Sequence, residues 1–204
     1  MRDLVIILDP AHGSDVPGKS SPDGKHKEYI WSRMICNKLK TQLSSLGFRV
    51  EITNKTDKEI GLSNRKNFAS NLKLDNPRQV KFLVSLHNNG AGDGTKWANA
   101  RGFEIYTTPG QTRSDLFADI IFNNLKKDFP TYKARVDLSD GDNDKESKFT
   151  VLMGSGYSAV LLEWLFQDNQ EDVALLTSDM VNDNLVNSLV GSFMYIDDNL
   201  DKLK

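Results

Sequence analysis

The sequence predicts a single α/β domain built on a mostly parallel, twisted sheet with helices on both faces. Short apolar runs rich in Val, Ile, Leu and Phe, as strands are, lie between turn residues at 4–8, 48–52, 80–86, 102–107 and 159–166. Apolar residues at helical spacing fill most of the gaps between these runs. Because strands that alternate with helices are joined by crossover connections, the sheet should be largely parallel and covered on both faces.

Four amphipathic stripes mark the expected helices. The first three consist of Trp31, Ile35, Leu39 and Leu43, then Leu62, Arg65, Phe68, Ala69 and Leu72, then Phe117, Ile120, Ile121 and Leu125. The last consists of Val181, Leu185, Leu189 and Phe193. No internal repeat and no linker interrupts the pattern, so we expect residues 1–204 to form one domain. The Gly/Asn-rich segment 88–101 and the acidic segment 137–148 should be irregular.

Composition narrows the classes of function. A net charge of -2 over 204 residues gives no electrostatic basis for binding nucleic acid or an anionic membrane surface. The single cysteine, Cys36, excludes an intramolecular disulfide and a cysteine-based metal cage, and its apolar neighbours predict a buried thiol. The apolar run near the N-terminus is too short for a signal peptide, and no stretch approaches the roughly 20 apolar residues of a membrane span. We therefore expect a monomer made in the cytoplasm, without an export signal or membrane insertion.

Two predicted strands end in a histidine followed by turn residues. In "LVIILDPAHGSD", Pro10 cannot donate to a sheet ladder and Gly13 permits a positive φ, so the strand ends in a tight turn that carries His12. In "VKFLVSLHNNG", His87 stands at the corresponding point. Parallel strands have their carboxyl ends at one edge of the sheet, where such sheets place functional side chains, so the two imidazoles should lie close together. The alternative is a pair of unrelated, solvated loop histidines.

Three carboxylates need separate explanations. Glu28 lies just before the first helical stripe, where it is either a helix-start charge or a ligand. Glu163 interrupts "AVLLEWLF", the most apolar run of the chain, so it needs either a structural counter-charge or a functional role at the end of the strand. Glu104 in "RGFEIYTT" is expected to face water, because its neighbours alternate toward the interior.

Two imidazoles and one carboxylate are the ligand set of many catalytic zinc sites, in which a water takes the fourth position. His12, Glu28 and His87 complete such a set, and Glu163 would act as a base toward that water. The acidic stretch "DLSDGDNDKES", with carboxylates at 140, 142 and 144, does not fit an EF-hand calcium loop. Lys145 stands where the turn needs glycine and no glutamate follows at the last ligand position, so we expect a solvated loop.

Four blocks of the sequence resemble the zinc-dependent N-acetylmuramoyl-L-alanine amidases of the Amidase_3 family, found in bacterial autolysins and phage endolysins. The block "LDPAHG" resembles the family's strand ending in Asp-Pro-Gly-His-Gly, and "VSLHNN" resembles its Ser-Leu-His-Ala-Asn block. "ARGFEIYT" is similar to the following strand of the family, and "AVLLEWLFQDNQED" is similar to its terminal block. The blocks come in the family's order and span residues 4 to about 195.

This resemblance implies that His12, Glu28 and His87 bind Zn²⁺ and that Glu163 is the catalytic glutamate. The substrate would be peptidoglycan, cleaved at the amide between N-acetylmuramic acid and L-alanine. Glu163 would accept a proton from the attacking water and deliver it to the departing nitrogen.

The chain departs from the family's pattern at three points. Ala11 replaces the usual Gly, the Pro usual before the last strand is missing from "GSGYSAVLLE", and Trp164 stands where a small residue is common. Trp164 either contacts the substrate or packs. The loops 13–27 and 88–101 flank the histidines and should line the groove. Without an export signal or wall-binding repeats, the chain resembles an endolysin for host-cell lysis. The alternatives are another zinc amidohydrolase or carboxypeptidase on a related scaffold, and a non-catalytic cell-wall-binding homologue.

Overall fold

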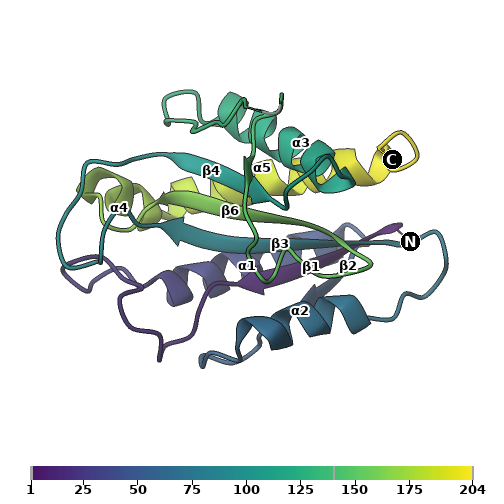
Figure 1. Cartoon of the computed structure of the whole chain (residues 1–204), viewed down its shortest axis with the longest axis horizontal. Helices are drawn as coiled ribbons and strands as arrows, with labels where there is room; N and C mark the ends of the chain where they lie inside the picture. Colours follow the sequence, from purple (N-terminus) through teal and green to yellow (C-terminus); the bar gives the residue numbers. More distant parts are fainter. Residues whose placement is uncertain (1, 140, 204) are drawn as a thin grey trace.

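A six-stranded sheet lies at the centre of the computed structural model, which describes residues 2–139 and 141–203 (Figure 1). The strands are β1 (Leu4–Pro10), β2 (Arg49–Ile52), β3 (Val80–Asn89), β4 (Phe103–Thr107), β5 (Lys145–Glu146) and β6 (Ser158–Phe166). The helices are α1 (Glu28–Ser45), α2 (Leu62–Asn71), α3 (Arg113–Asp128), α4 (Gln170–Leu176) and α5 (Asp179–Asp198).

The order of the strands across the sheet is β2-β1-β3-β6-β4-β5. The neighbours among β2, β1, β3 and β6 pair in parallel, whereas β4 runs antiparallel to β6 and β5 runs parallel to β4. The predicted α/β fold with a mostly parallel sheet is therefore confirmed. All five predicted strands are present. β5 is an additional strand that the sequence does not predict, because no apolar run marks it.

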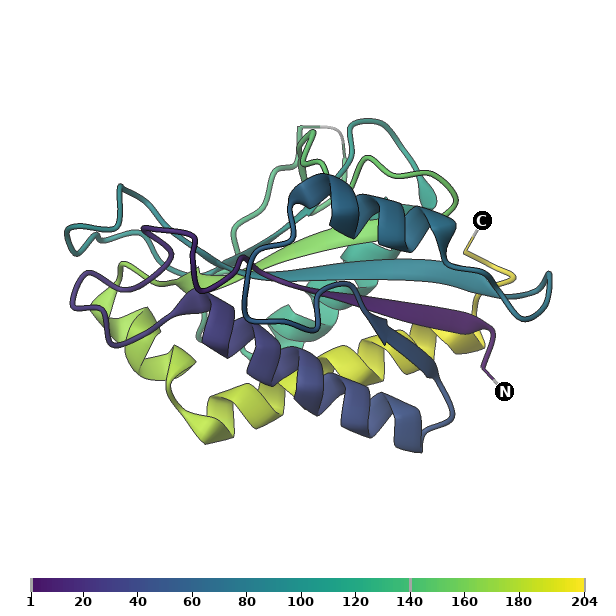
Figure 2. The same cartoon turned by 90° about the horizontal axis from the view of Figure 1, so that it is seen from below.

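Side chains along each central strand alternate between two hydrophobic layers. Leu4, Ile6 and Leu8 of β1 belong to the larger layer, which the apolar stripes of α1, α3 and α5 cover. Ile7 points to the other face, where Ala69 of α2 and the segment 149–157 complete a smaller layer. Figures 1 and 2 show α2 on one side of the sheet and α1, α3 and α5 on the other. Helices therefore cover both faces, as the sequence predicts.

The four predicted helical stripes coincide with α1, α2, α3 and α5. The stripe on α2 is the weakest, because Leu62 is 53% exposed and Leu72 lies beyond the end of the helix. Arg65 and Ala69 are the buried residues of this stripe, and only 1% of the surface of Arg65 is exposed. In the described ranges, no helix is long and apolar enough to span a membrane.

The acidic segment differs from the solvated loop that the sequence predicts. Asp144 is only 2% exposed, because the segment folds back onto the end of β4 and the start of α3. Asp142 is partly exposed, and Asp140 lies outside the described residues. Cys36 is buried, as expected.

The carboxyl ends of β1, β3 and β6 lie at one edge of the sheet, because these three strands are parallel. The loops that follow β1 and β3 extend from this edge, on the left in Figure 1, and both chain ends lie on the opposite side. The fold thereby gathers at one edge the segments that carry the predicted site.

Candidate active site

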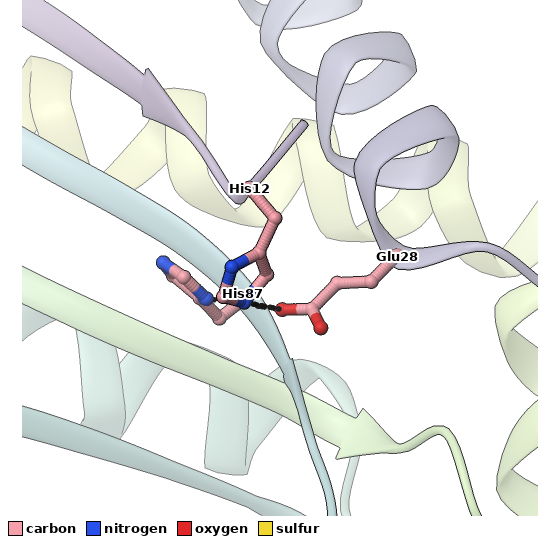
Figure 3. Close-up of side chains that lie close together, drawn as sticks. All are labelled: His12, Glu28 and His87. Carbon is pink, nitrogen blue, oxygen red and sulfur yellow. Dashed lines mark hydrogen bonds and ion pairs between the residues drawn. The ribbon is translucent and has the colours of Figure 1, made fainter. Parts of the chain in front are cut away.

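Three side chains from separate elements converge at this edge. His12 follows β1, His87 lies near the end of β3, and Glu28 is the first residue of α1. Oε1 of Glu28 lies 3.0 Å from Nδ1 of His87 and 3.5 Å from Nε2 of His12. The two imidazole rings meet edge to face, with 4.9 Å between their centroids (Figure 3). The structure thus brings together the three residues that the sequence marks as metal ligands.

The turn after β1 holds His12 in an unusual backbone conformation. Its φ of 47° lies in the left-handed region, which a residue other than glycine rarely adopts without support. The support comes from Arg33, whose guanidinium donates to the carbonyls of Ala11 at 3.0 Å and of His12 at 2.9 Å. Gly13 is needed next, since a Cβ there would stand 2.0 Å from the backbone nitrogen of Glu59.

The buried ion pair between Arg65 and Asp9 also fixes this turn. Arg65 donates to Oδ1 of Asp9 at 2.9 Å, to the carbonyl of Pro10, and to the carbonyl of His12 at 3.2 Å. Ser85 and Thr53 donate to the Asp9 carboxylate as well, so this carboxylate serves the architecture of the turn. Such contacts fix the backbone around His12 and so the position from which its side chain extends into the site.

Glu28 is held on both of its oxygens. Oε1 accepts from the backbone N–H of Asn88 at 3.1 Å, and Oε2 accepts from Nε2 of Gln167 at 3.0 Å. Burial alone would raise the pKa of Glu28, but hydrogen bonds and charge from His12 and His87 outweigh it and lower this pKa. Burial likewise opposes protonation of His87, yet the Glu28 carboxylate raises the pKa of His87.

These donors fit a catalytic zinc ion. The three ligand atoms lie within 4.8 Å of one another, and the set of two imidazoles and one carboxylate is typical of such sites. A neutral imidazole can carry its single N–H on either ring nitrogen, so the two nitrogens that face this carboxylate oxygen can instead present their lone pairs to a cation. Gln167 and Asn88 supply the outer hydrogen bonds that orient a ligating carboxylate.

Glu163 lines the same cavity, which has a volume of about 240 Å³. On β6 it stands opposite His87 of β3, and it is partly exposed. Its buried Oε2 has no hydrogen-bond partner within residues 2–139 and 141–203. Burial is the main cause that raises the pKa of Glu163 to about 7, against the positive charge of His87 and with added repulsion from Glu28 and Glu104.

Glu104 corrects an expectation from the sequence. It does not face water but is 3% exposed, because β4 lies between β6 and β5 and segments on either side supply its partners. Its carboxylate accepts from Arg135 at 2.8 Å and Lys145 at 2.6 Å, and also from Asn89 and Tyr106. Glu104 is therefore a compensated, buried charge beside the site.

Trp164 packs in the core. Its side chain is fully buried against Phe103, Phe129 and Tyr132. Of the two roles that the sequence left open, substrate contact is therefore excluded for the native fold, since no part of the ring reaches the surface.

The loop 88–101 is tied to the end of β6. Oδ2 of Asp168 accepts from the backbone N–H groups of Ala91 at 2.7 Å and Gly92 at 3.0 Å. Asn169 donates to the carbonyl of Ala98 at 2.9 Å. Residues at the end of β3, of the loop that follows it and of the segment 13–27 line the cavity, namely Gly18, Lys19, Asn88, Asn89, Gly90, Gly92 and Gly94.

Sequence comparison identifies the family. The chain matches the family described as N-acetylmuramoyl-L-alanine amidase over residues 6–192, which is nearly its whole length. The chain belongs to this family. The amidase family predicted from the four sequence blocks is therefore confirmed.

Curated relatives of this amidase family member come from bacteria and a phage. A probable cell wall amidase LytH of Staphylococcus saprophyticus is 28% identical over 181 residues, which are 88% of this chain and 54% of the relative. An endolysin of Bacillus phage SPP1 is 29% identical over 184 residues, which are 86% of this chain and 59% of the phage protein. The chain thus spans little more than half the length of these relatives.

Solved structures show the same fold. An N-acetylmuramoyl-L-alanine amidase from Clostridium difficile 630 superposes with a TM-score of 0.80 at 23% identity, over 96% of this chain and 97% of the other. The catalytic domain of the CD27L endolysin, which targets Clostridia Difficile, superposes with a TM-score of 0.65 at 16% identity, over 94% and 97%. At these identities the likeness concerns the fold of the amidase domain.

Sequence reasoning missed the residues that support the site. Arg33, Arg65 and Gln167 hold the turn and the carboxylate in place, although none of them is a candidate ligand. Only Arg65 left a signal, since it is a charged residue at a core-facing position of a helical stripe. Asp168 left none, because its role depends on which loop folds over it.

Proposed function

We propose that this protein hydrolyses the amide between N-acetylmuramic acid and L-alanine in peptidoglycan and that the activity requires zinc. One observation carries the proposal. His12, Glu28 and His87 present their ligand atoms within 4.8 Å of one another in a cavity that Glu163 also lines. Membership of the amidase family supports the choice of bond.

His12, Glu28 and His87 would hold the zinc ion, with Gln167 and Asn88 orienting the carboxylate. When bound, zinc supplies Lewis acidity that polarises a substrate carbonyl and lowers the pKa of a water to about 7. The remaining chemistry is the transfer of a proton, which a positioned side chain must perform.

Glu163 is the residue that we assign to this transfer. As a carboxylate it accepts the proton of the water that attacks the lactyl carbonyl, and as a carboxylic acid it returns that proton to the alanine nitrogen as the C–N bond breaks. Without the metal, burial raises the pKa of Glu163 to about 7, so this carboxyl is not confined to the ordinary acidic range of a glutamate. Its buried Oε2 accepts no hydrogen bond within the described residues, so no donor stabilises the charged form at that oxygen.

Digestion of purified peptidoglycan tests the reaction. Mass spectrometry should show free stem peptides that begin with L-alanine, together with glycan strands that keep intact lactyl groups. Another zinc amidohydrolase or a carboxypeptidase would instead release D-alanine or cut within the stem. A non-catalytic homologue would bind the sacculi and release nothing.

Metal analysis tests the zinc site. The wild-type protein should carry one zinc per chain, and His87→Ala should lose it, because two ligands remain. The third histidine offers a matched control. His26 is buried and contacts Oδ1 of Asn88 at 2.8 Å, but it lies outside the ligand group, so His26→Gln should keep the zinc. Full zinc occupancy in His87→Ala would refute the assignment.

We propose host-cell lysis, as a phage endolysin, for the biological setting. Similarity to the phage SPP1 endolysin supports this role, although cell wall amidases are equally similar. The protein should lyse a host whose peptidoglycan it digests when it is expressed inside and the membrane is then permeabilised. A loss of culture turbidity that requires Glu163 supports the role, and intact cells would exclude it.

Size-exclusion chromatography with light scattering should show a monomer.

A further inference from the structure

A second group of acidic side chains lies away from the zinc ligands. Asp115 of α3, Asp142 and Asp144 each offer a carboxylate oxygen, and these oxygens lie within 4.8 Å of one another. Thr107, the last residue of β4, stands among them, with Oγ1 at 2.8 Å from Oδ1 of Asp115 and 2.5 Å from Oδ2 of Asp144. The group joins three segments that are far apart in the sequence.

Asp115 lies in the first turn of α3, where the helix N-terminus and the backbone N–H of Thr112 offset part of its charge, but no side-chain cation of the described residues compensates the group. No lysine, arginine or histidine in the described part of the chain lies within 4.0 Å of any of the three carboxylates. Asp115 and Asp144 are 5% and 2% exposed, so water cannot screen them well. A buried carboxylate without a counter-charge is costly and calls for a proton or a cation.

Two oxygens in the group have no partner. Oδ1 of Asp144 and Oδ1 of Asp142 are buried and accept no hydrogen bond within residues 2–139 and 141–203. The other oxygens have partners. Oδ2 of Asp144 and Oδ1 of Asp115 contact Thr107, Oδ2 of Asp142 accepts from Gln111 at 3.1 Å, and Oδ2 of Asp115 accepts from the backbone N–H of Thr112. The Thr107 hydroxyl has a single proton for two carboxylates, so it cannot satisfy both.

We propose that Asp115, Asp142, Asp144 and Thr107 form a calcium site. All available donors are hard oxygens, which Ca²⁺ prefers, whereas the imidazoles that zinc prefers are absent from the group. Metal–oxygen distances of about 2.3–2.6 Å allow ligand oxygens as far apart as those of this group. Waters commonly complete the coordination of Ca²⁺ where protein oxygens do not fill it.

The ion would fasten the acidic segment to the body of the domain. Asp144 directly precedes β5, whose Lys145 pairs with Tyr106 of β4 and donates to Glu104 at 2.6 Å. Calcium would therefore stabilise the outer edge of the sheet, a role that is independent of the proposed amidase reaction.

Calorimetric titration of CaCl₂ into the zinc-loaded protein tests the proposal. The binding curve should give one Ca²⁺ per chain. The unfolding temperature should rise by about 5–10 °C at a hundredfold excess over the dissociation constant. Mg²⁺ should bind more weakly, because it demands near-ideal octahedral geometry. No response up to about 10 mM CaCl₂, beyond the range of weak calcium sites, overturns the proposal, and so does a preference for Mg²⁺.

Three variants locate the effect. Asp144→Asn and Asp142→Asn should each lower the calcium affinity at least about tenfold, since each removes a charged ligand. Both should fold without calcium, because they relieve repulsion. Asp119→Asn is the matched control, since Asp119 of α3 accepts from Asn143 at 2.7 Å but is not in the group. It should keep the response, and a full calcium response in Asp144→Asn overturns the proposal.

A shared proton is the rival explanation. Burial raises the pKa of Asp144 to about 7, against the hydrogen bond from Thr107 and together with a side-chain hydrogen bond to Asp142 and the charges of Asp142 and Asp115. Between the unfolded value of about 3.9 and this value, the folded chain keeps a proton that the unfolded chain loses, so stability falls as the pH rises. Added calcium should abolish this fall. A fall that calcium leaves unchanged shows a proton-sharing pair and overturns the site.

Discussion

Glu104 and Glu163 stand directly opposite each other on the antiparallel strands β4 and β6. Like charges in this position repel, yet the pKa values of the two carboxyls shift in opposite directions. Hydrogen bonds from Lys145, Tyr106 and Arg135 outweigh burial and lower the pKa of Glu104, whereas burial raises the pKa of Glu163. The neighbours therefore keep one carboxylate charged and leave the other able to exchange a proton.

The first prediction concerns Glu104→Gln. The change leaves Arg135 and Lys145 without their counter-charge, and because both still reach water the cost should be about 1–3 kcal/mol of unfolding free energy. The pKa of Glu104 is lowered on folding, so its stabilisation is present above the unfolded value of about 4.3 and is lost as the pH falls through the folded value.

Urea unfolding of the zinc-free proteins checks this prediction. The difference from wild type should stay constant from about pH 7 to 5 and shrink near pH 3. Tyr106→Phe is the control, because it removes one hydrogen bond to the same carboxylate and should cost only about 1 kcal/mol. A Glu104→Gln variant as stable as wild type would show that the ion pairs of Glu104 with Arg135 and Lys145 do not stabilise the fold.

The second prediction concerns Glu163→Gln. The substitution keeps the shape of the side chain and removes the proton acceptor, so the release of stem peptide should fall by about 10²–10⁴. Zinc content should not change, since Glu163 is outside the ligand group. Stability should change little, because Oε2 has no partner to lose in the described part of the chain. Thermal unfolding and peptide release are measured on the same zinc-loaded samples.

A structural role for Glu163 would give the opposite pair of results. If the carboxylate neutralised a buried cation, Glu163→Gln would cost about 3–5 kcal/mol of folding stability while the folded fraction kept its rate. That outcome would show that Glu163 is not the base and that another, unidentified group accepts the proton.

The third prediction concerns Gln167. Replacing it with Leu removes the donor to Oε2 of Glu28 and should weaken zinc binding by about 10–100-fold, as losses of an outer hydrogen bond do. Gln79→Leu is the matched control, because Gln79 is equally buried and bonds the backbone of Asp75 far from the ligands. Competition with a chelator of known affinity measures both. Equal zinc affinities in the two variants would remove Gln167 from the site.

The sequence predicts the parts of this structure that depend on local pattern. All four apolar positions of the stripe on α5 are buried, because helical spacing places them on one face. The meeting of His12 and His87 follows from parallel strands alone. The burial of Glu104 and Asp144 could not be predicted, since β5 is two residues long and forms only when distant segments meet. The same holds for Gln167, which reaches Glu28 across 139 positions of sequence.

The last prediction concerns the buried pair of Arg65 and Asp9. Arg65→Met keeps much of the side-chain volume but strands the Asp9 carboxylate, which is 1% exposed, so it should cost about 3–5 kcal/mol of unfolding free energy. The carbonyl of His12 also loses its hydrogen bond from Arg65, which helps to fix the turn, so zinc affinity should fall. Arg49→Met is the control, because Arg49 pairs with the more exposed Asp75 and should cost less than about 1 kcal/mol.

Adding Asp9→Asn to Arg65→Met separates charge from packing. If the stranded carboxylate causes most of the loss, the double variant should recover part of the stability, because the remaining amide is neutral. Zinc affinity should stay low in the double variant, since the carbonyls of Pro10 and His12 still lack their donor. Urea unfolding with zinc titration decides between the two causes. A double variant that recovers both stability and zinc affinity would show that Arg65 only neutralises Asp9 and does not position His12.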